Sequence, residues 1–472
     1  MLKYDAIIIG SGQAANPLAE KLAAAGWKTV LIEKKFIAGT CINVGCTPTK
    51  TLIASGRVAY LTKRSADYGV HTTGHSIDIE AVIKRKNAHV LSARESSTKR
   101  LLETQNLDVV FGNAVFSGPK EVTVTKEDGS IATMTAEKIF INIGTRPAIP
   151  PIEGLSEVQY YTSDTILDLL AIPSHLAIIG GSYIALEFGQ LYRRLGSEVT
   201  VIEGNEQFLS KEDADIAAEI KKILEEDGIR ILTGAKVKRV GAHGVNIDIE
   251  VETTNGTSAA AGRQAPATTE TITGSHLLVA TGRLPETAAL NPGVAGIITD
   301  KHGFITVDGK LQTNIPGIYA LGDVKGGPQF THISYNDYVI LYKNLIGNAD
   351  LSITGRETIY CLFTDPELGR VGLTEKMARE KGLNIKVVTL PASRIARAWE
   401  NDEMRGMLKA IVNLDNKMIL GAAMLCSNGG ELMSILQMAM MGNVTYDRIR
   451  DAVYAHPTFA ESLNNLFAGV DQ

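Results

Sequence analysis

Two copies of one sequence pattern restrict the fold of this chain more than any other feature. Residues 7–15 read IIIGSGQAA and residues 177–185 read AIIGGSYIA. In both copies the glycine turn is followed by a further Gly at the same offset (Gly26 and Gly196) and by an alternating apolar run that ends in Glu. A strand, a glycine turn, a helix and a second strand in this order form a dinucleotide-binding unit. The sequence therefore predicts an α/β protein with two Rossmann-like units.

Each position of the turn has a physical role. The first Gly makes the tight turn, the second lets the backbone approach a pyrophosphate, and a small third residue lets helix and strand pack closely. The helix N-terminus binds the phosphates, and the terminal acid accepts a hydrogen bond from a ribose 2′-hydroxyl. The alternative is a doubly wound sheet whose glycines only pack, and Ser182 stands where the second copy would normally have Gly. The predicted contacts are Gly10, Gly12, Ala14, Ala15 and Glu33 in the first unit, and Gly180, Gly181, Ser182, Tyr183, Ile184 and Glu203 in the second.

Length and charge exclude several classes of function. The 472 residues suggest about three domains at roughly 100–200 residues each. A net charge of −5 and an aromatic content of 6% do not fit a nucleic-acid binder. The apolar run 432–441 contains Ser434 and Gln437 and is shorter than the roughly 20 residues of a membrane helix. The N-terminus lacks the apolar region of a signal peptide. We therefore expect a cytoplasmic protein without nucleic-acid or membrane partners.

Two of the four cysteines form a close pair. Cys41 and Cys46 follow the first unit, and one distorted helical turn can bring residues at this spacing within disulfide distance. A metal clip and two buried thiols are the alternatives, but metal sites normally use a shorter spacing and further nearby ligands. The pattern favours a redox disulfide beside the ligand of the first unit, and no metal site. Cys361 and Cys426 have no close Cys neighbour, and we expect them to be inert packing residues.

Together with further short motifs, these residues resemble group I pyridine nucleotide-disulfide oxidoreductases. This flavoprotein class includes lipoamide dehydrogenase, glutathione reductase and mercuric reductase. The resemblance covers nearly the whole chain, and the order of the motifs makes it specific. Besides the two units and the Cys pair, the motifs are TNIPGIYALGD at 313–323, ATGR at 280–283, IGTRP at 143–147, GNA at 112–114 and HPTFAE at 456–461.

The resemblance implies a set of roles. FAD binds the first unit and NAD(P)H the second, with NADH favoured because Glu203 would repel a 2′-phosphate and no Arg follows it closely. Cys46 faces the flavin and Cys41 exchanges with substrate. His456 and Glu461 form an acid–base dyad that serves Cys41 of the other subunit in a homodimer. Lys50 lies by the flavin and pairs with Glu187. The further cofactor contacts implied are Gly39, Thr40, Lys50, Gly112, Ala114, Gly144, Thr145, Glu187, Gly282, Gly322 and Asp323.

The same resemblance predicts the domain organisation. Residues 1–146 and 275–340 form the FAD domain, and residues 147–274 form the NAD(P) domain inserted between them. Residues 345–472 form an α+β interface domain. The stretch Thr253–Gly274, rich in Thr, Ala and Gly, is predicted to be a flexible hairpin loop without chemistry.

The predicted activity is transfer of electrons from NAD(P)H through FAD to the Cys41–Cys46 disulfide and on to a disulfide, metal ion or oxidant. The motifs CTPTKT and QFTHIS look closest to the mercuric-reductase-like and reactive-chlorine-resistance flavoproteins. However, Ala38 replaces a usual Gly, no Cys follows Glu461, and Tyr454 stands where lipoamide dehydrogenases usually have His. The alternatives are a dihydrolipoyl dehydrogenase, a mercuric or copper(II) reductase, and a non-catalytic FAD or dithiol metal-binding protein. The dyad argues against the last, because simple binding needs no acid–base pair.

Overall fold

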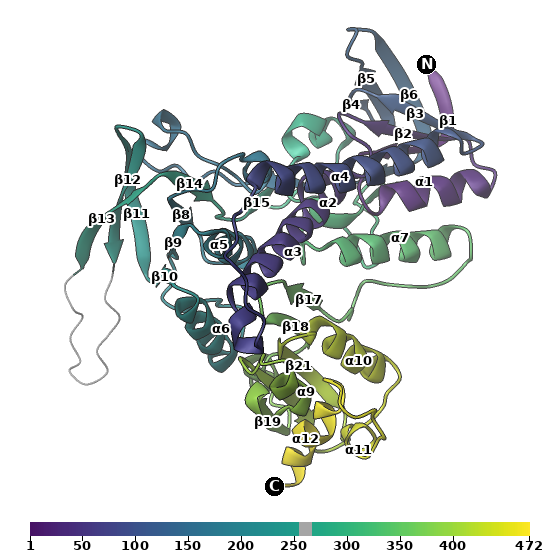
Figure 1. The fold of residues 1–472 in the computed structure, drawn as a ribbon. Coiled ribbons are helices and arrows are strands. Elements are labelled where there is room, and N and C mark those ends of the chain that lie inside the picture. Colours follow the sequence, from purple (N-terminus) through teal and green to yellow (C-terminus); the bar gives the residue numbers. More distant parts are fainter. Residues whose placement is uncertain (254–266) are drawn as a thin grey trace.

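The structure is a computed structural model that describes residues 1–253 and 267–472. These residues form three parts, each built on its own main β-sheet (Figure 1). In the first sheet the strand order is β3-β2-β1-β6-β5-β4, and β16 adds to β6 in parallel. Its strands are β1 (Leu2–Ile9), β2 (Thr29–Glu33), β3 (Leu107–Phe111), β4 (Asn113–Gly118), β5 (Glu121–Thr125), β6 (Ile131–Ile141) and β16 (Ile318–Ala320).

Helices cover the first sheet and bury its apolar strands. Ile7, Ile8 and Leu31 have no exposed surface. Helix α1 (Ala15–Ala24) packs beside α7 (Thr331–Leu345), and α3 (Cys46–Lys63) packs against α4 (Ile79–Leu102) (Figure 1). The short helix α2 (Gly39–Val44) precedes α3. Because α3 also packs against α5 of the second unit, the segment with the Cys pair lies between the two predicted dinucleotide units.

The second sheet repeats the core of the first. Its parallel strands have the order β10-β9-β8-β14. An antiparallel sheet of β11, β12 and β13 and the short pair β7 and β15 lie beside it. The elements are β7 (Thr145–Pro147), β8 (His175–Ile179), α5 (Tyr183–Leu195), β9 (Glu198–Ile202), α6 (Ala214–Glu226), β10 (Ile229–Leu232), β11 (Ala235–His243), β12 (Asn246–Thr253), β13 (Thr268–Gly274), β14 (His276–Val279) and β15 (Arg283–Pro285).

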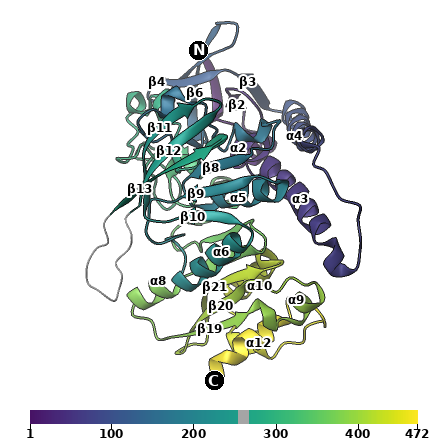
Figure 2. The same ribbon diagram turned by 60° about the vertical axis from the view of Figure 1, so that its left-hand side comes forward.

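The third sheet is antiparallel and follows both units in the chain. Its order is β17-β18-β21-β20-β19, and Figure 2 shows α6 between this sheet and the second one. Its elements are β17 (Ile359–Leu362), β18 (Glu367–Gly372), α8 (Glu375–Glu380), β19 (Ile385–Pro391), α9 (Ala396–Glu400), β20 (Met407–Asn413), β21 (Ile419–Cys426), α10 (Gly429–Met441), α11 (Tyr446–Arg450) and α12 (Ser462–Ala468).

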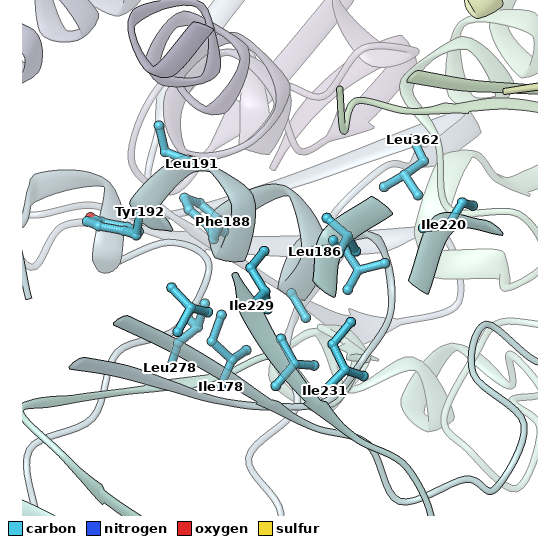
Figure 3. Close-up of a cluster of buried hydrophobic side chains, with 14 of the residues drawn as sticks. Ile178, Leu186, Phe188, Leu191, Tyr192, Ile220, Ile229, Ile231, Leu278 and Leu362 are labelled. Atoms are coloured by element: carbon cyan, nitrogen blue, oxygen red, sulfur yellow. The ribbon is translucent and has the colours of Figure 1, made fainter. Parts of the chain in front are cut away.

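One buried cluster joins the second and third parts. Ile178, Phe188 and Ile220 of the second unit pack in the same cluster as Leu362 of the C-terminal sheet (Figure 3). Leu368 of that sheet belongs to the same cluster. These side chains are at most 2% exposed. The apolar core is therefore continuous across α5 and α6.

The structure confirms the predicted α/β class with two Rossmann-like units, and it corrects two details. Residues 268–274 form β13, which pairs with β12, so the predicted loop 253–274 ends in a strand; residues 254–266 lie outside the described part of the chain. Strand β14 was predicted to belong to the first domain, but it is hydrogen-bonded to β8 in the second sheet. The other domain boundaries stay a prediction.

Candidate active site

A large cavity lies between the two units. Its volume is about 1920 Å³, whereas ordinary small-molecule sites measure roughly 300–1,000 Å³. Gly10 and Gly12 of the first unit line it, as do Ser182 and Tyr183 of the second. The cavity also contains most of the other predicted site residues: Glu33, Gly39, Thr40, Cys41, Cys46, Lys50, Gly112, Ala114, Gly144, Thr145, Ile184, Glu187, Gly282 and Asp323.

At the first glycine of each turn, a backbone carbonyl at the end of the neighbouring strand leaves no room for a side chain. Gly10 has a φ of +91°, and a Cβ there would lie 2.5 Å from the Asn142 carbonyl oxygen. Gly180 has a φ of +105°, and a Cβ there would lie 2.4 Å from the Ala280 carbonyl oxygen. No other residue type fits either position without moving the backbone. Ala15 and Ala185 are buried where the helix packs on the sheet, as predicted, and Ala14 is buried as well.

The two terminal acids hold their turns in the same way. Glu33 accepts hydrogen bonds from the backbone N–H of Ser11 at 2.8 Å and of Lys35 at 2.9 Å. Glu203 accepts from the backbone N–H of Gly181 and of Asn205, both at 2.7 Å. Because a carboxylate has about four lone-pair sites, each acid can still accept from a ribose hydroxyl.

The cavity wall fits a dinucleotide. Gly144 and Gly282 both have positive φ, and a Cβ at either would meet no protein atom within 4 Å, so the absent side chains leave room for a ligand. Asp323 lies on the same wall, and the Thr145 hydroxyl donates to it at 3.1 Å. Burial raises the pKa of Asp323, although Arg283 opposes this shift. Arg283 in turn donates to the Thr145 hydroxyl at 2.8 Å.

Asn142 is an important residue that the sequence motifs did not reveal. Its Oδ1 accepts from the Ala15 N–H at 3.2 Å, and its Nδ2 donates to the Leu321 carbonyl at 2.7 Å. A Cβ at Gly12 would lie 2.4 Å from Asn142 Oδ1. The second glycine is therefore needed for the Asn142 side chain as well as for the approach of a ligand.

The Cys pair lies where two helices meet. Cys41 is in α2 and Cys46 is the first residue of α3, so the expected distorted turn is in fact a break at Gly45. A Cβ at Gly45 would lie 2.9 Å from the Thr40 carbonyl and 3.2 Å from Cys41 Cα. Both cysteines are free thiols in this structure. Ala38, where the family pattern has Gly, adopts a φ of +77°, the left-handed region that favours Gly.

The two thiols differ in acidity. The Cys41 thiol donates to the Cys46 sulfur and lowers the pKa of Cys46 to about 6, and Thr331 and Lys50 act in the same direction against burial. The Thr331 hydroxyl lies 3.3 Å from Cys46 Sγ. The same contact with Cys46, together with burial, raises the pKa of Cys41. Cys46 is therefore the thiolate of the pair, as expected at a helix N-terminus beside a cation.

Lys50 and Glu187 form the predicted pair. Lys50 Nζ lies 2.6 Å from Glu187 Oε2, and the Glu187 side chain is only 7% exposed. The Phe363 N–H donates to Glu187 Oε1 at 3.0 Å, and Lys50 Nζ lies 4.6 Å from the centre of the Phe363 ring. Phe363 thus fixes both members of the pair, a role that no sequence motif indicated.

His456 and Glu461 are close to each other but lie outside the cavity. His456 Nδ1 is 2.9 Å from Glu461 Oε2, and the His456 side chain is 67% exposed. Neither residue is among the described residues that line the cavity. Within one chain the dyad is therefore formed without a thiol beside it.

Among the described residues, no group of three or more His, Cys, Asp or Glu side chains is placed to hold a metal ion. No helix in the described part of the chain is long and apolar enough to cross a membrane.

Comparison with known proteins agrees with this geometry. The family model for pyridine nucleotide-disulphide oxidoreductases matches residues 4–337, and the model for their dimerisation domain matches residues 358–467. The chain is 39% identical to the probable pyridine nucleotide-disulfide oxidoreductase RclA of Escherichia coli, over 99% of both chains. It is 34% identical to a mercuric reductase of Lysinibacillus sphaericus, over 98% of this chain and 81% of that protein.

A solved structure is similar over the full length. It is described as a Cu(II) complex of the HOCl-induced flavoprotein disulfide reductase RclA from Escherichia coli. It has a TM-score of 0.88 and 38% identity, and it covers 100% of both chains. The fold, the paired dinucleotide units, the Cys pair and the sequence matches lead to one conclusion: the chain belongs to the pyridine nucleotide-disulphide oxidoreductase family.

Proposed function

We propose that this chain is an NADH-dependent reductase that passes electrons through the Cys41–Cys46 pair to a metal ion, with Cu(II) as the expected acceptor. The observation that carries the proposal is the lowered pKa of Cys46 beside the less acidic Cys41, inside the cavity shared by both units. The RclA structures of Escherichia coli that resemble this chain include Cu(II) complexes, which supports the choice of metal.

Membership of the family implies FAD and a nicotinamide cofactor. In our proposal, Gly10, Gly12, Glu33 and Asp323 would hold FAD, and Ser182 and Glu203 would hold the nicotinamide nucleotide. FAD, when bound, supplies the hydride-accepting chemistry that side chains cannot perform. Glu187 holds Lys50 beside the Cys pair, and the Lys50 cation favours the Cys46 thiolate although the Glu187 carboxylate opposes it.

The Cys pair can deliver its electrons to two metal ions. With Cys46 as the thiolate, oxidation of the pair to the disulfide releases two electrons and the one proton of Cys41, and the electrons reduce two Cu(II) to two Cu(I). Cys41 is the thiol that must lose its proton to attack or bind an acceptor. We propose that the His456–Glu461 dyad of the other subunit accepts this proton, because His acts as a base near neutral pH.

Other acceptors are less well supported. Lipoamide dehydrogenases usually carry a His at the position of Tyr454, and mercuric reductases carry a C-terminal Cys pair that is absent after Glu461. The dimerisation domain supports a homodimer. A cytoplasmic location and the lack of nucleic-acid or membrane partners stay predictions.

The test is NADH oxidation by the purified protein with a panel of acceptors: Cu(II), Hg(II), oxidised lipoamide and glutathione disulfide. A Cu(I)-specific chelator measures the product, and the Cys41→Ser variant controls for reduction by the flavin alone. We expect Cu(II) to give the highest kcat/KM, with two Cu(I) formed for each NADH. Faster turnover with oxidised lipoamide, or undiminished Cu(I) formation by Cys41→Ser, would refute the proposal.

A further inference from the structure

A fully buried carboxylate lies next to the proposed flavin site but takes no part in the chemistry above. Asp337 on α7 is 0% exposed. Its Oδ2 accepts a hydrogen bond from the Gly322 N–H at 2.8 Å, and its Oδ1 accepts from Arg356 Nη1 at 2.7 Å. Lys325 Nζ lies 3.3 Å from Oδ2. One carboxylate therefore connects three segments that are separate in the sequence.

The buried Asp337 carboxylate depends on Lys325 and Arg356 to compensate its charge. A buried charge persists only if it is paired and hydrogen-bonded, and removal of one partner leaves the other uncompensated. Lys325 is itself 5% exposed at its side chain, and Arg356 is 19% exposed. The arrangement is thus a closed ion cluster rather than a surface salt bridge.

The partners of Asp337 flank Asp323 on both sides. Gly322 and Lys325 are the first and last residues of one 3₁₀ turn, Gly322–Lys325, and Asp323 lies between them on the cavity wall. Gly322 has a φ of +69°, and a Cβ there would lie 2.6 Å from Ser334 Oγ. The backbone of this turn is therefore held against α7 by Asp337 and Ser334.

The side chain of Asp323 is held from the opposite direction. The Thr145 hydroxyl donates to it, and Arg283 donates to that hydroxyl. Thr145 and Arg283 therefore fix the carboxylate itself, whereas Asp337 fixes the backbone that carries it. A ligand hydroxyl that binds Asp323 depends on both supports, because displacement of about 1 Å weakens a hydrogen bond strongly.

We infer that Asp337 is a positioning residue of the flavin site, which acts through Gly322 and Lys325 to place Asp323 for the sugar-alcohol chain of FAD. The inference rests on the proposed role of Asp323. Asp337 is not among the described residues that line the cavity, so it acts on Asp323 from behind the cavity wall.

The test is FAD release from the full-length purified holoprotein on dilution, followed by the recovery of free FAD fluorescence. Asp337→Asn keeps the shape of the side chain but leaves Lys325 and Arg356 without their carboxylate. We expect the dissociation constant of FAD to rise by roughly 10- to 100-fold, the range of one charged hydrogen bond. Asp350→Asn is the matched control, because Asp350 pairs with Lys310 at the surface and is 84% exposed. An unchanged FAD affinity in Asp337→Asn would overturn the inference.

A double-mutant cycle separates positioning from a general loss of packing. If Asp337 acts through Asp323, the effect of Asp337→Asn should largely disappear in an Asp323→Ala background. Additive effects would overturn the inference. If Asp337→Asn does not fold, Lys325→Met replaces it in the same cycle, with the same two outcomes. FAD titration requires no electron acceptor, so a chain that binds no FAD would refute the proposed function, whereas unchanged binding by the variant refutes only this inference.

Discussion

The protonation of Cys46 is the feature of a single residue that most directly supports the proposed chemistry. Its pKa is lowered to about 6, so the reduced protein should hold a thiolate well below the pH at which free Cys ionises. We expect iodoacetamide to alkylate Cys46 with a midpoint near that pH. Thr331→Val removes one donor and should raise the midpoint by roughly one pH unit. The measurement is the alkylation rate as a function of pH, with the site mapped by mass spectrometry.

Thr358→Val is the control for this experiment, because Thr358 also lines the cavity but is not one of the groups that hydrogen-bond Cys46. It should leave the midpoint unchanged. Equal midpoints for wild type and Thr331→Val would show that the hydroxyl does not stabilise the thiolate.

Glu203 should determine the choice of nicotinamide cofactor. Its carboxylate is fixed by Gly181 and Asn205 at the end of β9, where it can accept from a 2′-hydroxyl and repel a 2′-phosphate. Glu203→Gln removes the charge and should raise the kcat/KM ratio of NADPH to NADH by at least about tenfold. Glu206→Gln, an exposed neighbour, should leave the ratio unchanged. A wild-type preference for NADPH would contradict the assignment.

The residues whose contacts the sequence motifs did not predict share one physical property; Thr331 belongs to the motif QFTHIS, which indicated no role for it. Asn142, Thr331 and Phe363 each act on a segment far away in the chain, and the contact of Thr331 with Cys46 spans 285 positions. Glycine turns and terminal acids can be predicted, because their geometry is local and repeats. An amide or a hydroxyl that reaches a distant segment has no period and no fixed spacing, so only the folded chain identifies it.

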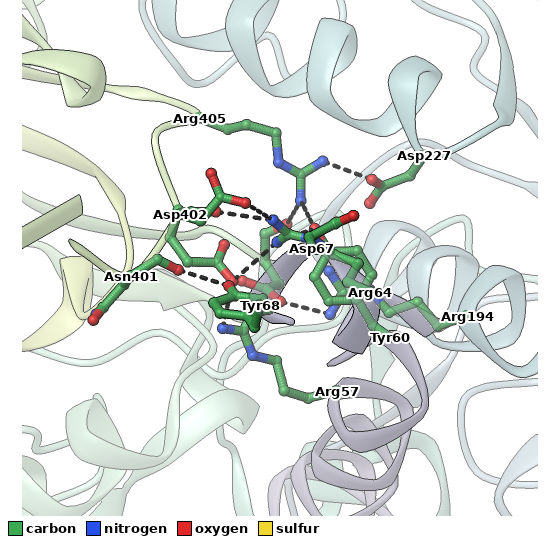
Figure 4. Close-up of polar contacts among 12 residues, drawn as sticks. Arg57, Tyr60, Arg64, Asp67, Tyr68, Arg194, Asp227, Asn401, Asp402 and Arg405 are labelled. Carbon is green, nitrogen blue, oxygen red and sulfur yellow. Dashed lines mark hydrogen bonds and ion pairs between the residues drawn. The ribbon is translucent and has the colours of Figure 1, made fainter. Parts of the chain in front are cut away.

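At the level of elements, helix α3 links the Cys pair to the C-terminal sheet. It begins at Cys46 and ends in a polar cluster around Tyr60 (Figure 4). Arg194 Nη1 lies 2.7 Å from Asp365 Oδ2, and Arg57 contacts the same carboxylate. The Arg194 guanidinium carbon is 4.1 Å from the centre of the Tyr60 ring. The C-terminal end of α3 is therefore held by charged side chains from α5 and from the loop after β17.

These ion pairs of Asp365 should make the free energy of unfolding depend on pH. Burial opposes the ionisation of Asp365, but Arg194 and Arg57 outweigh it and hold its pKa below the ordinary value. A carboxylate of this kind contributes stability above the pKa of the unfolded chain, and the contribution is lost as the pH falls through the folded pKa. Asp365→Asn should therefore destabilise the protein at pH 6, by roughly 1–3 kcal/mol, and by less below about pH 4.

Thermal unfolding of wild type and Asp365→Asn between pH 3 and pH 7 measures this difference. Asp67→Asn is the control, because Asp67 pairs with Arg64 at the same cluster but is 59% exposed. A difference in thermal stability between wild type and Asp365→Asn that does not change with pH would contradict the assigned role of the Asp365 charge.

Some elements could be predicted better than others. The repeated apolar runs before Gly10 and Gly180 indicated β1 and β8, because a buried parallel strand is apolar throughout. The Thr- and Ala-rich stretch before residue 275 indicated a loop, yet 268–274 is a strand. The reason is that β13 pairs with β12 and is largely exposed, so its sequence lacks the apolar signal.

At the level of the whole molecule, the dyad and the thiols must come from different chains if they are to meet. His456 and Glu461 lie outside the cavity that contains Cys41, and the dimerisation domain supports a partner copy. His456→Ala should slow acceptor reduction by ~10²- to 10⁴-fold and leave NADH-dependent flavin reduction nearly intact. A mixture of His456→Ala and Cys41→Ser subunits should recover about a quarter of wild-type activity. Half of the dimers are then hybrids, and in each hybrid one of the two sites has both Cys41 and His456.

The control mixes Cys41→Ser with Cys46→Ser subunits. Both cysteines of a pair come from the same chain, so no hybrid site is complete and no activity should return. Light scattering that finds only monomers, or equal recovery in both mixtures, would contradict a shared site.

The three-residue strand β16 has a consequence for the order in which a newly made chain can fold. Its partner β6 ends at Ile141, yet β16 begins only at Ile318. The strands of the second sheet, from His175 to Val279, are all translated before β16. The inserted unit can thus fold during synthesis while the first sheet still lacks a strand, since domains fold as units as they emerge. The Leu321 carbonyl that accepts from Asn142 follows directly after β16, so the first nucleotide site is completed only after the strands of the second have been translated.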